Sequence, residues 1–297
     1  MSAEQSLQPP SLDAIASQRW LDRSQASWLH EEVGRRMQDR LQWMRQTPQA
    51  WLDWWPLNGG LQTHALVRQR YPQSRAYLHE RHPGRHAQAL RALQGAWWQR
   101  LTGRERLQAE LPPSGGVDML WANMALHWVA DPMALLQQWH QALRVDGFVM
   151  FSCLGPDSLR EIQSLYRQRG WPSPCHAFTD MHDWGDMLVQ AGFAQPVMDM
   201  ERLTLTYASA EALLQDLRAM GRNLHRDRFG ACRGRAWRAQ LLDDVSAQAR
   251  TDAAGRCVLT VEVIYGHAIK LPARPRVAET STVSLADMRA MLKPESR

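Results

Sequence analysis

Residues 51–60, WLDWWPLNGG, have the outline of a strand that leads into a nucleotide-binding turn. An apolar run ends at Asp53, and the glycine pair Gly59–Gly60 follows a few residues later. Glycines in such a turn adopt positive φ without steric cost and let the backbone approach a ligand. Trp54 and Trp55, however, stand where such a turn normally has glycine. We interpret Asp53, Gly59 and Gly60 as cofactor-binding residues; the alternative is that Asp53 only caps the turn.

A second group of residues could bind an acidic substrate. His127 and Trp128 follow an apolar run that begins at Val117, and Arg160 lies in the segment DSLREI. Residues at the carboxyl end of a strand can line a reaction pocket, and arginine can hold a carboxylate through two parallel hydrogen bonds. The alternatives are a structural histidine, a packing tryptophan and a solvated helix arginine.

No catalytic residue or metal site is predicted. The sequence shows no Ser/His/Asp or paired-carboxylate signature. Its four cysteines are scattered without a CxxC motif, which supports neither a zinc site nor a disulfide framework.

The elements that must position these residues alternate between strands and helices. Helical spacing of apolar residues is found over 17–45, 61–71, 85–101, 131–143, 158–170 and 181–193. Strand patterns cover 50–53, 76–80, 117–126, 148–154, 196–207 and 257–271. This alternation predicts a doubly wound α/β domain, and the two long final strands are expected to be an antiparallel pair at a sheet edge.

The chain divides into three parts on this basis. Residues 1–46 are an N-terminal arm with a helical cover, residues 47–271 form the α/β domain, and residues 272–297 are a tail with a short amphipathic helix. Within the domain, residues 208–250 are a helical insert that can act as a lid over the strand ends.

Charge and composition limit the partners. The net charge is +5 and comes almost wholly from arginine, with a cluster of arginines between Arg222 and Arg238. This excess suits an acidic partner, and no nucleic-acid recognition pattern is present. No apolar stretch is long enough to span a bilayer, and the first residues do not resemble a secretory signal, so we expect a cytoplasmic location.

The sequence also resembles a known family. The segments VDMLWANMALHWVADP, WHQALRVDGFVMFSCLGPDSLREI, FTDMHDWGDMLVQAGFAQPVMDMERLTLTYAS and LTVEVIYGHA occur in this order between Val117 and Lys270. They resemble the malonyl-ACP O-methyltransferases of biotin synthesis, in their proteobacterial branch. The segment at residues 19–41 resembles the family's leading helix more loosely.

The resemblance implies a fold, a cofactor and a reaction. The fold is a class I, Rossmann-like, seven-stranded methyltransferase sheet, and the cofactor is S-adenosyl-L-methionine. The reaction esterifies the free carboxyl of malonyl-acyl carrier protein in early biotin synthesis. The partner is therefore an acyl carrier protein, an acidic protein that the arginine cluster suits.

The resemblance also implies residue roles. Asp53 ends the first strand, Gly59 is the last glycine of the turn, Glu80 is the acid that binds the ribose hydroxyls, and Asn123 lies beside the methionine part of the cofactor. The family's turn reads like LDxGCGxG, whereas the same register here is LDWWPLNG.

Three differences between this turn and the family's turn affect the expected cofactor site. Trp55 and Leu57 replace glycines, and Pro56 removes a backbone N–H donor. We expect the Trp55 indole to project into the space of the cofactor. The family's third strand and the acid after it have no clear counterpart between Leu101 and Glu110.

Two other functions stay open from the sequence. One is a catalytically degenerate relative that acts as a binding protein, which the replaced glycines motivate. The other is a methyltransferase-like enzyme that acts on a different substrate.

Overall fold

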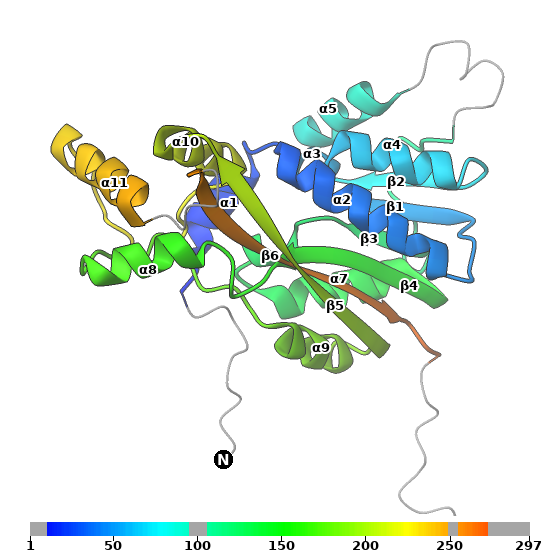
Figure 1. The fold of residues 1–297 in the computed structure, drawn as a ribbon. Coiled ribbons are helices and arrows are strands. Elements are labelled where there is room, and N and C mark those ends of the chain that lie inside the picture. Colours follow the sequence, from blue (N-terminus) through cyan, green and yellow to red (C-terminus); the bar gives the residue numbers. More distant parts are fainter. Residues whose placement is uncertain (1–10, 95–105, 249–254, 273–297) are drawn as a thin grey trace, which may run out of the picture.

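A computed structural model describes residues 11–94, 106–248 and 255–272. Its centre is a six-stranded sheet in the order β2-β1-β3-β4-β6-β5, with helices packed on both faces (Figure 1). The strands are β1 (Ala50–Trp54), β2 (Arg75–His79), β3 (Val117–Ala122), β4 (Leu143–Leu154), β5 (Ala194–Tyr207) and β6 (Cys257–Ile269).

The strand directions confirm a doubly wound α/β fold. Strands β2, β1, β3 and β4 are mutually parallel, β6 runs antiparallel to β4, and β5 runs antiparallel to β6. The expected antiparallel pair at one sheet edge is therefore β6 with β5.

The expected seventh strand is not confirmed, because the described residues contain six strands. At the outer edge of β2, where a further strand would pair, Leu107 makes one isolated parallel bridge with Ala76. Two backbone hydrogen bonds hold it: Ala76 donates to the Arg106 carbonyl at 2.9 Å, and Gln108 donates to the Ala76 carbonyl at 2.8 Å. In the described part of this segment, pairing is limited to that contact.

Alternating strand residues build a separate core on each face of the sheet. Trp51, Met119 and Met150 belong to one core, and Leu52 and Leu120 belong to the other. Strands that are buried on both faces read as nearly continuous apolar runs, which is why the central strands could be recognised from the sequence.

Helices cover both faces of the sheet. The first core is covered by α2 (Trp28–Arg40), α4 (Leu61–Arg70) and α5 (Pro83–Leu93). The second core is covered by α1 (Ala14–Leu21), α7 (Pro132–Ala142) and α9 (Met181–Gln190). Short helical turns lie at α3 (Pro56–Gly59), η1 (Leu41–Trp43) and η2 (Leu126–Trp128). The sequence had predicted helix to residue 101, but residues 95–101 lie outside the described part.

The start of α7 shows how local sequence fixes a helix boundary. The Asp131 carboxylate accepts a hydrogen bond from the Ala134 N–H at 3.0 Å, and Pro132 takes the first helical position. A side-chain acceptor and a residue without an N–H together reduce the number of unsatisfied donors at a helix start.

The predicted insert contains two helices, α10 (Ala210–Met220) and α11 (Arg235–Gln248). With α8 (Arg160–Gln168) they surround a third core, in which Leu165, Leu213 and Leu241 are buried. Figure 1 shows these three helices together at one end of the sheet. We refer to α10, α11 and the segment between them as the lid. The predicted helix in the tail lies outside the described residues.

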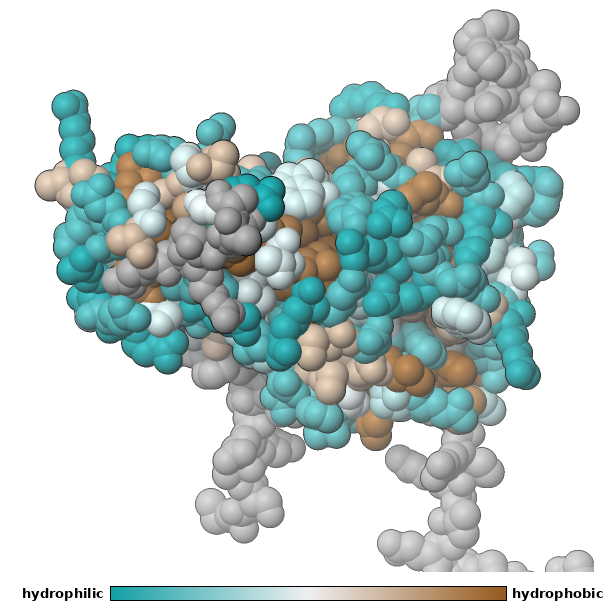
Figure 2. Space-filling view, viewed as in Figure 1, coloured by the Kyte–Doolittle hydropathy of each residue, from teal (hydrophilic) through white to brown (hydrophobic). Residues whose placement is uncertain are grey.

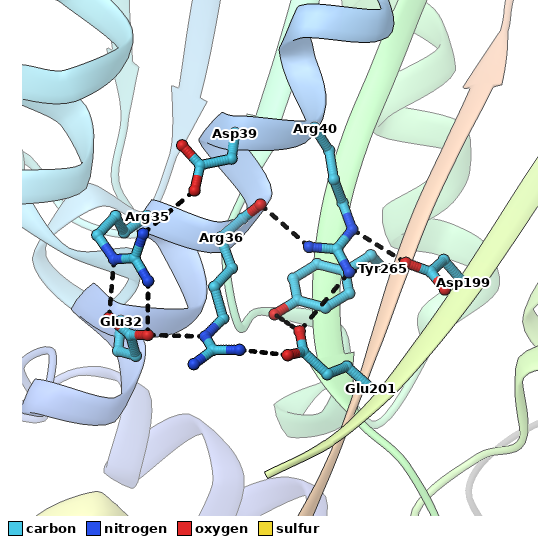
Figure 3. A network of polar contacts seen from close by, with 8 residues as sticks. All are labelled: Glu32, Arg35, Arg36, Asp39, Arg40, Asp199, Glu201 and Tyr265. Carbon is cyan, nitrogen blue, oxygen red and sulfur yellow. Dashed lines mark hydrogen bonds and ion pairs between the residues drawn. The ribbon is translucent and has the colours of Figure 1, made fainter.

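Helix α2 is tied to the antiparallel edge of the sheet by charged side chains (Figure 3). Arg36 pairs with Glu201 on β5, and Arg40 pairs with Asp199 at 2.7 Å. The Arg40 guanidinium also lies 3.7 Å from the ring centroid of Tyr265 on β6. Exposed ion pairs contribute little singly, so this network sets the position of α2 more than the stability of the fold.

Helix α2 also approaches α4 closely at Gly34. A Cβ atom at position 34 would overlap the Thr63 side chain. We predict that Gly34→Ala destabilises the fold by about 1–3 kcal/mol, the usual cost of an overpacked contact, despite the better helix propensity of alanine. Urea unfolding measures this.

The matched control is Gly84→Ala in α5, where a Cβ meets no atom within 4 Å. This variant should be neutral or slightly stabilised. A Gly34→Ala protein as stable as the unsubstituted chain would contradict the close approach.

Candidate functional site

Five residues that the sequence assigns to a cofactor lie at the carboxyl ends of β1, β2 and β3. They are Asp53, Gly59, Gly60, Glu80 and Asn123, and we call them the donor-side cluster. All five are buried. Contacts within the chain show how each of them is engaged.

Asn123 joins the turn after β1 to helix α2. Its side-chain amide donates one hydrogen bond to the Gly59 carbonyl and a second, of 2.7 Å, to the His30 carbonyl. Its side-chain oxygen accepts from the Ser152 hydroxyl at 2.6 Å. Both ends of the amide therefore bind groups of the chain itself.

Asp53 is paired with a histidine. Its Oδ2 atom lies 2.7 Å from Nδ1 of His64 on α4, and both side chains are buried. Burial raises the pKa of Asp53, while the hydrogen bond to His64 acts in the opposite direction. Asp53 thus fastens α4 to the end of β1.

Glu80 is bound on both carboxylate oxygens. Oε1 accepts the N–H of Leu57 at 2.9 Å, and Oε2 accepts Nε of Arg85 at 3.2 Å. Arg85 is itself buried and donates to the Ser24 carbonyl at 3.0 Å and to Asn58 Oδ1 at 2.8 Å. Burial raises the pKa of Glu80, and the bonds from Leu57 and Arg85 oppose this rise. A carboxylate expected to bind ribose hydroxyls is thus engaged by the chain.

In the turn after β1, Trp55 has a backbone conformation that glycine usually adopts. Trp55 has φ of 61° and ψ of 58°, in the left-handed region, which costs a non-glycine residue roughly 1–2 kcal/mol. Its N–H donates to the His79 carbonyl at 2.8 Å, and its side chain is only 4% exposed. The indole lies 6.1 Å from Trp54 and 5.5 Å from the Arg81 guanidinium. The Trp55 ring is therefore buried near Arg81, which follows β2, and its projection into the space of the cofactor stays a prediction.

Gly60 lies against helix α2. Its φ is +126°, and a Cβ atom there would come within 2.5 Å of Glu31 Oε2. The Glu31 carboxylate accepts hydrogen bonds from the N–H groups of Gln62 at 3.1 Å and Thr63 at 2.9 Å, and from the Thr63 hydroxyl at 2.9 Å. Position 60 therefore requires glycine both for its backbone and for the approach of Glu31.

A cavity of about 560 Å³ lies beside the donor-side cluster, under the lid. Its walls include Leu29 and His30 from α2, Met124 and Trp128 after β3, and residues of α8, α10 and α11. Figure 2 shows apolar surface between the lid and the body of the domain. No member of the donor-side cluster lines the cavity, although Met124 follows Asn123 directly. We call it the acceptor cavity.

The three predicted substrate residues are placed differently. Trp128 lines the acceptor cavity, whereas His127 is buried behind it and burial lowers its pKa well below the ordinary value. Arg160 does not line the cavity; its side chain is 45% exposed and its Nε atom lies 3.4 Å from Glu161. The substrate-binding roles of all three residues stay predictions from sequence.

The cavity also contains residues that sequence reasoning did not assign to a substrate site. His176 lines it and donates from Nε2 to the His127 carbonyl, with an N–O distance of 2.7 Å. Burial lowers the pKa of His176 to about 4, so this ring is neutral at pH 7. Arg222 also lines the cavity and follows α10. Neither lies in a recognisable motif, because both reach the cavity from segments that only tertiary packing brings there.

The fold defines the class of protein. Residues of this chain superpose on the YcgJ protein from Bacillus subtilis with a TM-score of 0.52 and 15% identity, over 82% of this chain and 100% of that one. A putative methyltransferase from Bacillus halodurans gives a TM-score of 0.53 and 12% identity, over 81% of this chain and 100% of that one. With the strand order described above, the fold is that of a class I methyltransferase.

Sequence similarity defines the family. The chain is 38% identical over 268 residues to the malonyl-[acyl-carrier protein] O-methyltransferase of Laribacter hongkongensis, covering 84% of this chain and 86% of that protein. It is 38% identical over 263 residues to the enzyme of the same name from Gallionella capsiferriformans, with the same coverage. No family model matches the chain. The chain belongs to the malonyl-[acyl-carrier protein] O-methyltransferase family.

The groups expected to hold S-adenosylmethionine are engaged within the chain in the arrangement described here. Glu80 and Asn123 bind groups of the chain, Trp55 fills space beside the ends of β1 and β2, and a side chain of α2 lies against Gly60. The fold thus brings together the residue types that a cofactor site requires, but their polar groups bind other groups of the chain.

The tryptophan turn leads to a prediction. The double variant Trp55→Gly, Leu57→Gly should bind S-adenosylhomocysteine at least tenfold more tightly than the unsubstituted chain, a gain of about 1.4 kcal/mol or more. The reason is that two buried side chains are removed from the turn and glycine relieves the left-handed strain at position 55. Titration calorimetry measures the affinity, and circular dichroism checks the fold.

Trp54→Gly is the control, because Trp54 is as buried as Trp55 while positions 55 and 57 stay unchanged. It should bring no gain in affinity. Unchanged or weaker binding by a folded double variant would count against obstruction by the turn.

Proposed function

We propose that the chain is a cytoplasmic methyltransferase that esterifies the free carboxyl group of malonyl-acyl carrier protein in early biotin synthesis, with S-adenosyl-L-methionine as methyl donor. The observation that carries this proposal is the similarity to the two curated relatives, which extends over 84% of the chain. The names of those relatives give the substrate and the reaction.

The acceptor cavity supports the substrate class. It lies beyond the carboxyl ends of the parallel strands, where doubly wound folds bind ligands. Its volume of about 560 Å³ is within the usual range for a small-molecule site, and apolar residues make up much of its wall. A short acyl chain on a flexible arm matches such a cavity.

Arg222 supports a carboxylate in that cavity. Its guanidinium lies 5.1 Å from the Trp20 ring, and its Nη1 donates to the backbone carbonyls of Arg218 and Gly221. Among the described residues it makes no ion pair with a carboxylate. Burial lowers the pKa of Arg222, and the nearby charges of Arg218 and Arg23 lower it further. An anionic group would relieve this crowding of positive charge.

The chemistry places few demands on the protein's own residues. A malonyl carboxylate is ionised at pH 7, because the ordinary pKa of a carboxyl group is about 4, so methylation of it requires no general base. The chain then has to bind the acyl group, orient one carboxylate oxygen and exclude water. The apolar wall, Trp128 and Arg222 supply these functions.

The lid supports an acidic carrier protein as partner. Arg226, Arg235 and Arg238 are exposed on it, and Arg238 also lines the cavity that the acyl group would enter. Exposed arginines mainly increase the rate and specificity of association with an acidic partner. The carrier would dock on the lid and deliver its acyl group beneath it.

The direct test is incubation of the purified chain with malonyl-acyl carrier protein and S-adenosylmethionine, followed by mass spectrometry of the intact carrier. The expected result is a gain of one methyl group, with no gain on butyryl-acyl carrier protein, which has no free carboxyl. The chain should also restore growth without biotin to a strain that lacks its methyltransferase. A folded chain that leaves malonyl-acyl carrier protein unchanged and fails to complement would refute the proposal.

A single substitution tests the acceptor side. Arg222→Gln should raise KM for malonyl-acyl carrier protein about 10–100-fold, since a charge-assisted hydrogen bond contributes roughly 1.5–3 kcal/mol. Arg160→Gln is the control, because Arg160 lies outside the cavity. If Arg160→Gln has the larger effect on KM, the assignment of the carboxylate to Arg222 is wrong.

A further inference from the structure

Helix α2 binds the donor-side cluster at consecutive residues. The His30 imidazole binds the Asn58 carbonyl, with an Nδ1–O distance of 2.7 Å, and the His30 carbonyl accepts from Asn123. The next residue, Glu31, extends its carboxylate to the first turn of α4. His30 and Glu31, in one turn of α2, therefore both bind groups at the donor-side cluster.

The contacts of Glu31 are those of a bound ligand. Two backbone N–H groups and one hydroxyl donate to its carboxylate, all at the start of a ten-residue helix that follows a glycine. The N-terminus of a helix after a tight turn is the place where a doubly wound fold binds anions, because unpaired N–H groups and the helix dipole both favour negative charge.

The cofactor of the proposed function carries the same chemical group. The methionine part of S-adenosylmethionine ends in an α-carboxylate, which requires N–H donors when it is buried. At the start of α4, the N–H groups of Gln62 and Thr63 are already engaged by Glu31. A second carboxylate there would meet both a lack of donors and the repulsion of a like charge.

We propose that Glu31 is an internal ligand of the donor-side cluster. Its carboxylate occupies the place of the cofactor's amino-acid carboxylate, and cofactor binding requires α2 to release it. The inference rests on the proposed function for the identity of the cofactor, and its test is a binding measurement that needs no turnover.

The rest of α2 explains why the internal ligand is held firmly. Because residue 34 is glycine, α2 approaches α4 so closely that a Cβ atom there would overlap Thr63. The ion pairs of Arg36 and Arg40 hold the C-terminal end of α2 on β5 (Figure 3). Trp28 at the other end donates from its indole nitrogen to Asp216 on α10 at 2.9 Å. Helix α2 is thus fixed at both ends, so holding the Glu31 carboxylate in place costs little conformational entropy.

The experiment compares two neutralising substitutions on one helix. Glu31→Gln removes the internal carboxylate, whereas Glu32→Gln removes an equal charge from the next residue, which pairs with Arg35 and Arg36 on the surface of α2. Titration calorimetry of the full chain uses S-adenosylhomocysteine as one probe. Methylthioadenosine, which lacks the amino-acid part, is the second probe.

The expected result is at least tenfold tighter binding of S-adenosylhomocysteine by Glu31→Gln than by the unsubstituted chain. Glu32→Gln should stay within about threefold of the unsubstituted chain. Methylthioadenosine should gain less than threefold from Glu31→Gln, because it has no carboxylate to take the vacated place. Thermal melting confirms that each variant is folded, and Glu31→Ala provides a second removal of the carboxylate.

Three results would overturn the inference. The first is equal affinity of Glu31→Gln, Glu31→Ala and the unsubstituted chain for S-adenosylhomocysteine. The second is an equal gain for both probes, and the third is no detectable binding by either Glu31 variant at millimolar probe. A chain that fails to methylate malonyl-acyl carrier protein while Glu31→Gln gains affinity would refute the proposed function and leave this inference standing.

Discussion

The arrangement of the site depends on one buried side-chain amide, that of Asn123. Its nitrogen binds carbonyls from helix α2 and from the turn after β1, and its oxygen binds a hydroxyl on β4. A buried amide is costly unless its donors and acceptor are satisfied, so the three segments are held in one arrangement. Its partners lie as far as 93 residues from Asn123 in the sequence.

This constraint separates the two halves of the site. Because α2 is drawn onto the strand ends, the donor-side cluster is covered and its polar groups are engaged within the chain. The acceptor cavity lies under the lid, which packs with α8 around a core of its own. The result is a family member whose acceptor side has space for a ligand and whose donor side is filled by its own residues.

The unfavourable features of the donor-side cluster are offset by other contacts in the chain. Trp55 accepts a left-handed backbone that glycine would adopt freely, and burial of its indole offsets the strain. Arg85 neutralises Glu80, which would be unfavourable as an isolated buried carboxylate. Glu31 satisfies the N–H groups at the start of α4. The strained backbone at Trp55, the buried charge of Glu80 and the N–H groups at the start of α4 are thus each offset by burial or by a contact within the chain.

The sequence by itself determined the elements, the family and the residue types of the donor-side cluster, because apolar periodicity, helix caps and long consecutive motifs are local properties. It identified Asp53, Glu80 and Asn123 at strand ends, and it identified Trp55 at a position where the family's turn has glycine. Only the tertiary structure decided which groups these residues bind, that Arg222 and not Arg160 lines the cavity, and that the described residues beside β2 pair with it through a single bridge at Leu107. Those outcomes depend on pairings between segments far apart in the chain, and the relative positions of such segments are set by packing that no local pattern encodes.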